Sequence, residues 1–249
     1  MTRHLLVIGG QRCGTTALHH LLDAHPDITM ARPARPEPKV FCSEQLSARG
    51  LAWYRETYFA HATTETLWGD KSTSYLDVAT SAGRAAAMLG RAEIVAQLRD
   101  PVARAVSHWR FSSASGREDR PLERALEQTM DGERSWDAST SSVSPYAYLE
   151  RGRYVDHLQP WFRAFPDSVH VLFLEETSSQ PSAASSLYRR LGVDPAFRAS
   201  GVDRPVNSSE GPTPRLDAGL ERALRDWFAD SDALLAAALG RALPWASAN

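Results

Sequence analysis

The sequence predicts an α/β fold, a single domain over residues 1–249 with a mainly parallel central sheet flanked by helices. Two observations carry this prediction. A chain of 249 residues is long enough to bury one sizeable core. Short apolar runs then alternate along it with stretches whose apolar residues recur at helical spacing, as in a parallel sheet with helices on both faces. In such sheets ligands bind beyond the carboxyl ends of the strands.

The first half of the chain alternates most clearly. Residues 4–9 form an apolar run that ends in Gly-Gly, which predicts a buried strand, and residues 15–24 follow with helical spacing. Three prolines in residues 31–42 exclude a helix interior and predict an extended loop. The next predicted elements are a helix over 51–59, a strand over 67–70, a helix over 77–89, a strand over 93–98 and a helix from Asp100-Pro101 to about Phe111.

The second half is less regular. A stripe of apolar residues over 154–165 predicts a helix, and VHVLFLEE, residues 169–176, predicts the strand that follows it. Residues 132–145 are polar and serine-rich and predict a mobile loop. The remaining predicted elements are helices from 121 to about 130 and from about 217 to 239.

Composition excludes several classes of protein. A net charge of −2 lacks the basic excess of a protein that binds polyanions, so we expect no nucleic-acid partner. Two cysteines, Cys13 and Cys42, are too few for a disulfide framework and indicate a reducing compartment. The first ten residues do not resemble a signal peptide, and no apolar run reaches membrane-spanning length. We therefore expect a cytoplasmic protein with no membrane partner; the oligomeric state is not predicted.

The stretch VIGGQRCGTTAL predicts a P-loop-like phosphate site. Gly9, four residues, Gly14, Thr15 and Thr16 have the spacing of a nucleotide phosphate loop, with Thr15 where a kinase or ATPase has lysine. Backbone N–H groups and the helix dipole at such a turn bind anions. Thr15 cannot neutralise a triphosphate, whereas Arg12 can reach a shorter anionic ligand. A tight turn with capping threonines is the alternative interpretation.

A second candidate anion site lies in LRDPVARAVSHWRF, residues 98–111. Arg99 closes a predicted strand and Ser107 follows eight positions later in the predicted helix, so both can face the crevice that the first loop faces. Taken alone, Arg99 could pair with Asp100, and Ser107 could bond its own backbone. Together with the loop they predict a second anion clamp.

Four stretches, VIGGQRCGTTAL, PEPKVF, GDKSTSYL and LRDPVARAVSHW, resemble in their order and spacing the sulfotransferases that use 3′-phosphoadenosine 5′-phosphosulfate (PAPS). The branch that they resemble contains the heparan sulfate sulfotransferases and many bacterial relatives. The resemblance spans about residues 5–111, with a weaker likeness over 151–176. It implies that a loop of Arg12, Cys13, Gly14, Thr15 and Thr16 holds the 5′-phosphosulfate, and that Arg99 and Ser107 hold the 3′-phosphate.

The resemblance also implies catalytic roles. Glu37 matches the family's general base, Lys71 matches a lysine near the transferring group, and Lys39 is a weaker candidate; each is otherwise a solvated residue. Arg12 replaces the family's usual lysine, which keeps the charge but makes a role in stabilising the leaving phosphate less secure than a role in binding. We expect no metal, because Arg and Lys donors can stabilise the transferring sulfuryl group.

Other residues with possible chemistry are interpreted more plainly. Cys13 is read as a packing residue within the loop, and the setting of His19, His20 and His25 near the first helix favours core, cap or surface roles. The proline-rich residues 203–215, with Arg204, Asn207 and Arg215, are candidates to close over the nucleotide or form an ordinary surface loop.

The resulting hypothesis is sulfuryl transfer from PAPS to a hydroxyl or amine of a small acceptor by in-line displacement, with Glu37 as base. One alternative is a small-molecule or nucleotide kinase on the same scaffold, which Thr15 in the lysine position disfavours. The other is a nucleotide-binding module without catalysis, which the presence of Glu37 and Lys71 disfavours.

Overall fold

The computed structural model describes residues 2–132, 134–137, 144–179, 182–199 and 214–246. The chain divides into two compact units. Unit 1 comprises residues 1–98 and 158–207, and unit 2 comprises residues 99–157 and 208–249. One domain over the whole chain stays a prediction, and the two units are described separately below.

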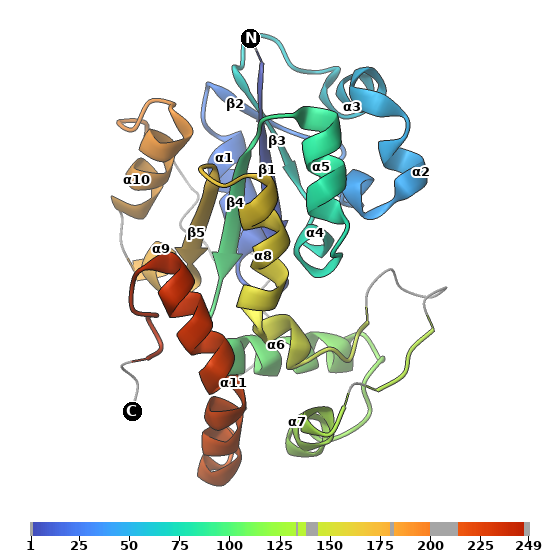
Figure 1. Ribbon diagram of the computed structural model, residues 1–249, viewed down its shortest axis with the longest axis vertical. Helices are drawn as coiled ribbons and strands as arrows, with labels where there is room; N and C mark the ends of the chain where they lie inside the picture. The colour runs from blue at the N-terminus through green and yellow to red at the C-terminus, as the bar shows by residue number, and fades with distance from the viewer. Residues whose placement is uncertain (1, 133, 138–143, 180–181, 200–213, 247–249) are drawn as a thin grey trace. The chain divides into compact units, whose positions relative to one another are not determined.

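Unit 1 is built on a five-stranded sheet (Figure 1). The order is β2-β3-β1-β4-β5, and each neighbouring pair is parallel. The predicted α/β class with a parallel central sheet is therefore confirmed. The strands are β1 (Arg3–Gly9), β2 (Ile28–Met30), β3 (Leu67–Lys71), β4 (Glu93–Leu98) and β5 (Val169–Phe173).

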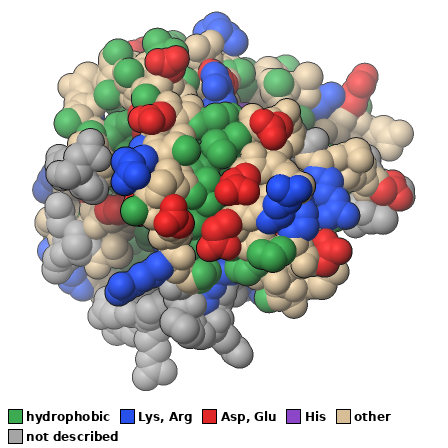
Figure 2. Space-filling view, turned by 90° about the horizontal axis from the view of Figure 1, so that it is seen from below, with side chains coloured by type: hydrophobic (Ala, Val, Ile, Leu, Met, Phe, Trp, Pro, Cys, Tyr) green, Lys and Arg blue, Asp and Glu red, His purple; other side chains and the backbone are tan. Residues whose placement is uncertain are grey.

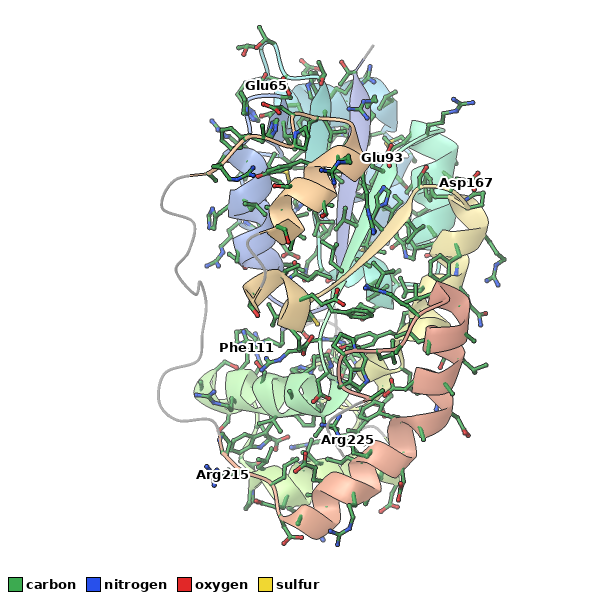
Figure 3. All side chains as sticks on the ribbon, turned by 90° about the vertical axis from the view of Figure 1, so that its left-hand side faces the viewer. Glu65, Glu93, Phe111, Asp167, Arg215 and Arg225 are labelled. Atoms are coloured by element: carbon green, nitrogen blue, oxygen red, sulfur yellow. The ribbon has the colours of Figure 1, made fainter. Side chains whose placement is uncertain are left out.

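Helices cover both faces of this sheet. α1 (Thr15–Asp23) and α10 (Ser182–Leu191) lie on one side, and α5 (Ser81–Leu89) and the part of α8 (Tyr154–Ala164) from Leu158 onward lie on the other (Figures 1 and 3). The apolar side chains between the sheet and the helices α1 and α10 form one continuous core. Alternate residues of each strand point to this face of the sheet, and residues three or four apart in each helix point back toward it. The buried members of this core are Leu5, Val7, Leu18, Leu22, Ile28, Met30, Leu67, Val95, Leu187, Tyr188, Leu191 and Val193.

The strand order places a topological switch point between β1 and β4. The chain leaves β1 toward β2 on one side, and it leaves β4 toward β5 on the other. Parallel sheets bind ligands at such a point, outside the carboxyl ends of the strands. The opposite, amino end of the sheet carries Glu65, Glu93 and Asp167, which Figure 3 shows where β3, β4 and β5 begin.

Three predicted elements of unit 1 need correction. The helix predicted over 77–89 starts only at Ser81, as α5; Asp77 instead ends a separate short helix, α4 (Ser74–Asp77), because Val78 is extended. The strand predicted over 169–176 stops at Phe173, whose partner Leu98 is the last residue of β4; without a neighbour the chain turns into α9 (Leu174–Ser179). The extended loop over 31–42 ends in a 3-10 turn, η1 (Val40–Cys42), beyond its last proline.

The rest of unit 1 follows the prediction in part. α3 (Gly50–Phe59) and β3 lie where expected. β2, α2 (Glu44–Ser47) and α10 were not predicted, because three or four residues show no period and α10 follows a serine-rich stretch. Among the described residues, no helix combines the length and apolar character needed to cross a membrane.

Unit 2 is helical. Its described elements are α6 (Pro101–Ala114), α7 (Leu122–Met130), η2 (Glu150–Gly152), the part of α8 before Leu158, and α11 (Ala218–Leu239). Asp100 starts α6 by accepting a hydrogen bond from Val102 N at 3.0 Å, and Pro101 occupies the first helical position, as predicted. The buried core of this unit contains Val102, Ala105, Val106, Leu122, Ala125, Leu126, Tyr148, Leu149, Leu220, Leu224 and Phe228.

The segment between α6 and η2 is anchored by Glu118. Its side chain is fully buried and accepts hydrogen bonds from Arg120 Nη2 at 2.6 Å and from Tyr148 Oη at 2.8 Å. Residues 133 and 138–143 of the predicted loop over 132–145, and residues 203–213 of the proline-rich segment, lie outside the described residues. The predictions made for them stay predictions.

Candidate active site

The glycine loop leaves β1 at the switch point and ends where α1 begins. Gly10 N donates to Gln97 O at 2.6 Å, which ties the loop to the end of β4. Gly14 precedes α1 with φ of 79°, in the left-handed region that glycine adopts without cost. A Cβ atom there would lie 2.7 Å from Leu174 Cδ1 and 3.0 Å from Gln97 Nε2. Only glycine fits this position.

The loop presents its anion-binding features together. Gly14 O accepts hydrogen bonds from Ala17 N and Leu18 N, and Gly14, as the N-cap residue, has no side chain with which to cap α1. The positive end of the helix dipole and the first N–H groups of α1 therefore lie at this turn. Arg12 has φ of 67°, a left-handed conformation that costs a non-glycine residue on the order of 1–3 kcal/mol. Strain of this kind is common at ligand sites.

The remaining loop residues divide by exposure. The side chains of Cys13 and Thr15 are buried, which suits the packing role predicted for Cys13, and Thr16 is partly exposed. The structure thus brings Arg12, Cys13, Gly14, Thr15 and Thr16 into one turn at the carboxyl edge of the sheet. Their contacts with a ligand stay predictions.

Glu37 and Lys71 are joined directly. Lys71 Nζ donates to Glu37 Oε1 at 2.6 Å, and both side chains are largely buried, with 7% and 17% of their surface exposed for Lys71 and Glu37. Thr73 holds the other oxygen, because its N–H and Oγ1 donate to Glu37 Oε2 at 2.9 and 3.0 Å. Lys71 ends β3 in register with Val7 of β1, so this pair also lies at the carboxyl edge of the sheet.

The buried carboxylate of Asp70, next to Lys71 in β3, holds the residues around this edge of the sheet. Asp70 accepts hydrogen bonds from Tyr75 Oη at 2.6 Å, Ser72 Oγ at 3.1 Å and Tyr54 Oη at 3.2 Å. Burial raises the pKa of Asp70 to about 6, although these three hydrogen bonds oppose the shift. Ser72 Oγ in turn accepts from Lys39 N at 2.9 Å, which fixes Lys39 in a left-handed conformation with φ of 51°. The segment that carries Glu37 is therefore fastened to the end of β3.

The histidines have different settings. His25 is buried, its Nδ1 accepts from Asp27 N at 3.1 Å, and its Nε2 lies 3.0 Å from Asp194 O; a core role is one of the three roles predicted for these histidines. His20 is exposed. His19 is buried, and burial together with the Lys71 ammonium lowers its pKa to about 4. A neutral imidazole thus lies in the electrostatic field of the Glu37–Lys71 pair, which the sequence did not suggest.

No three His, Cys, Asp or Glu side chains among the described residues are grouped as metal ligands. Transfer without a metal stays a prediction.

Arg99 and Ser107 belong to unit 2. Arg99 directly follows β4, and its carbonyl oxygen accepts from Tyr154 Oη at 2.8 Å, which fixes the backbone there. Both oxygens of Asp100 accept from Arg225, Oδ1 at 2.6 Å and Oδ2 at 2.8 Å. Ser107 lies two turns into α6, and the side chains of Arg99 and Ser107 are both partly exposed. That these two residues share a ligand with the loop stays a prediction.

Comparison with known proteins decides the family, since residues 2–189 match the sulfotransferase domain. The chain belongs to the sulfotransferase family. This confirms the resemblance and disfavours the kinase interpretation. Members of this family transfer a sulfuryl group, so the chain is classed as a transferase.

Curated relatives of this sulfotransferase include enzymes of heparan sulfate sulfation. It is 30% identical over 203 residues to the human bifunctional heparan sulfate N-deacetylase/N-sulfotransferase 2, an alignment that covers 76% of this chain and 22% of the relative. It is 32% identical over 165 residues to the mouse heparan sulfate glucosamine 3-O-sulfotransferase 3B1, covering 65% of this chain and 38% of the relative. The chain thus spans well under half the length of these relatives.

A solved structure supports the fold. The sulfotransferase from Alicyclobacillus acidocaldarius superposes with a TM-score of 0.78 at 23% identity, covering 98% of each chain. This likeness shows that the architecture of this sulfotransferase is that of a known member.

Two polar residues at the site were missed by the sequence reasoning. Thr73 holds Glu37, and its place two residues after Lys71 in GDKST was the available signal. Gln97 contacts the glycine loop, and its signal was an amide in the otherwise apolar end of the strand EIVAQL.

Proposed function

We propose that this sulfotransferase transfers the sulfuryl group of PAPS to a hydroxyl or amine, with Glu37 as general base. The carrying observation is the Glu37–Lys71 pair, 2.6 Å apart at the carboxyl edge of the sheet, on the edge from which the glycine loop leaves β1. A base and a cation beside an anion site are what sulfuryl transfer requires.

The loop fits a phosphosulfate better than a triphosphate. It offers N–H groups, the hydroxyls of Thr15 and Thr16, and the guanidinium of Arg12, but Thr15 stands where a triphosphate site has lysine. Arg12 supplies a planar fork of donors that suits two oxygens of one group. Arg99 and Ser107 are proposed to bind the 3′-phosphate, which ATP lacks.

The reaction then proceeds in one displacement. Glu37 takes the proton of the acceptor O–H or N–H as the acceptor atom forms a bond to sulfur, and the bond from sulfur to the 5′-phosphate oxygen breaks. The electron pair of that bond leaves on the phosphate oxygen. The Lys71 ammonium, Arg12 and the start of α1 stabilise the negative charge that develops there.

The contacts of Glu37 leave room for this role. A carboxylate can accept about four hydrogen bonds, and three are made by Lys71 and Thr73. Counting the described residues, one lone-pair position of Glu37 is thus left for the acceptor proton. Lys71 has three N–H donors, of which one is directed at Glu37, so the same ammonium can serve the base and the transferring group.

The acceptor is proposed to be a small molecule in the cytoplasm. The net charge of −2 gives no general attraction for a long polyanion. On the face shown in Figure 2, the described basic and acidic side chains are interspersed around apolar ones. The named relatives act on heparan sulfate, so a sulfated or uronic polysaccharide belongs in the acceptor panel as the contrasting substrate.

Two measurements test the proposed function. The melting temperature should rise more with 3′-phosphoadenosine 5′-phosphate (PAP) than with ATP and magnesium; ligand at about 100 times its Kd stabilises a protein by roughly 2.7 kcal/mol. Radiolabelled sulfate should then pass from PAPS to at least one member of a panel of small alcohols, phenols, amines and polysaccharides. A larger shift with ATP, or no transfer to any acceptor, would contradict the proposal.

A further inference from the structure

Gln97 is a buried amide at a position where an apolar side chain would make the folded protein more stable. It is the fifth residue of β4 in EIVAQL, it is 3% exposed, and it pairs with Leu172 of β5. Neighbouring residues that point to this face of the sheet, Val95 and Leu172, belong to or pack against the apolar core under α1 and α10. A glutamine there must place a polar head group against apolar neighbours.

The head group is only half satisfied. Gln97 Nε2 lies 3.5 Å from Thr177 Oγ1 in α9, a long hydrogen bond, and Gln97 Oε1 is buried without a partner among the described residues. A buried polar atom left unpaired destabilises a protein, whereas an apolar group of the same shape avoids the loss. The amide is therefore a poor choice for stability at this position.

The same residue touches both ends of the glycine loop. Its backbone carbonyl accepts Gly10 N at 2.6 Å, and its Nε2 faces Gly14, where even a methyl group would come within 3.0 Å. Gly14 is the residue at which α1 starts and its dipole is positive. The amide turns its N–H end toward this point and is joined through Thr177 to α9.

We propose that Gln97 is a positioning residue for the donor loop, which sets the place of Gly14 and directs the positive end of its amide dipole toward the bound phosphosulfate. This inference rests on the proposed function, since it concerns the donor of that reaction. A side-chain dipole fixed before the ligand arrives stabilises an anion in a buried site without reorganisation. The tighter binding of the donor would then offset the folding stability that is lost by burying the Gln97 amide.

A series at this one position tests the role. Gln97→Met keeps the length and removes the dipole, and Gln97→Glu keeps the shape and adds a negative charge. PAP affinity, measured by titration calorimetry, should fall about 5-fold for Gln97→Met and at least 10-fold for Gln97→Glu. A tenfold loss corresponds to about 1.4 kcal/mol of binding free energy. The urea midpoint of Gln97→Met should equal or exceed that of the wild type. KM for PAPS should rise while KM for the acceptor stays constant.

Two further variants make the outcome decisive. Gln159→Met, at an exposed position of α8, should change none of these quantities, and Thr177→Val should weaken PAP binding less than Gln97→Met does. Unchanged PAP affinity in Gln97→Met would overturn the inference and leave the proposed function standing. A Gln97→Met protein that unfolds at lower urea or does not fold would show a structural role and also overturn it. A wild type that binds no PAP would overturn the proposed function and this inference together.

Discussion

Glu37 Oε1 and Lys71 Nζ lie 2.6 Å apart, although the two residues are 34 positions apart in the chain. The two side chains are largely buried at the carboxyl edge of the sheet, and Thr73 holds the second oxygen of Glu37. Removing one member of such a pair leaves a partly buried charge without its partner, so the two residues act as a unit. Predictions about catalysis must therefore treat them together.

Glu37→Gln should lower turnover by about 10²–10⁴-fold, which is the usual contribution of a positioned general base. The amide oxygen can still accept from Thr73, whereas the amide nitrogen cannot accept from Lys71, so the side chain keeps two of its three hydrogen bonds while it loses the basic oxygen. PAP affinity should stay within a few-fold of wild type, because Glu37 is proposed to touch the acceptor and not the nucleotide. Single-turnover rates at saturating PAPS measure the effect.

Arg12→Ala is the matched contrast for Glu37→Gln. It should impair both PAPS binding and turnover, since its proposed target is the phosphosulfate itself. A Glu37→Gln enzyme that transfers sulfate at the wild-type rate would exclude Glu37 as the base.

Lys71→Met should reduce turnover by about 10²–10³-fold, the usual effect of removing one donor from a developing anion. The double variant Lys71→Met/Glu37→Gln should be little worse than the more severe single variant, because residues that act as a unit are strongly non-additive. A complete kinetic cycle of the four proteins checks this. If the fold-losses of the two single variants multiplied in the double variant, Glu37 and Lys71 would have no shared role in the reaction.

Arg99→Ala and Ser107→Ala should weaken PAP binding, the arginine more strongly. Hydrogen bonds to charged groups contribute about 1.5–3 kcal/mol, against about 1 kcal/mol for neutral ones. Adenosine 5′-phosphosulfate lacks the 3′-phosphate, so both variants should bind it as the wild type does. Equal losses for the two ligands in calorimetry would assign Arg99 and Ser107 to some other part of the site.

A structural feature could be predicted from the sequence where it depends on residues that are close together in the chain. The strand over 4–9 was predicted because it is an apolar run that ends in Gly-Gly, and the strand over 93–98 because its residues alternate. The end of β5 could not be predicted, because it depends on where β4 stops, and β2 is too short to show a period.

The candidate site follows the same rule. The glycine loop consists of consecutive residues, so the spacing of its glycines and threonines predicted it from the sequence alone. The Glu37–Lys71 contact joins two distant segments, and only the family resemblance suggested that both residues matter. Gln97 escaped notice because a single amide in a strand has no meaning until its neighbours, Gly10 and Gly14, are known.

The pH dependence of stability should reflect Glu118 in unit 2. Burial alone would raise its pKa, but hydrogen bonds from the side chain and backbone of Arg120 and from Tyr148 outweigh burial and lower the pKa from its ordinary value of 4.5 to about 2. A carboxyl whose pKa is lower in the folded state binds fewer protons there than in the unfolded chain. Its contribution to stability is thus complete above pH 4.5 and is lost as the pH falls from 4.5 to about 2.

Glu118→Gln should therefore lower the urea midpoint at pH 7 and, at the same time, flatten the loss of stability between pH 4.5 and 2. The charge-assisted hydrogen bonds that it removes contribute about 1.5–3 kcal/mol. Glu127→Gln, at an exposed position of α7, is the control and should change neither quantity. Tyr148→Phe removes a single donor to Glu118 and should give a smaller effect of the same sign. If Glu118→Gln shifted the midpoint by the same amount at pH 7 and at pH 3, the network would stabilise unit 2 by packing and not through the ionised carboxylate.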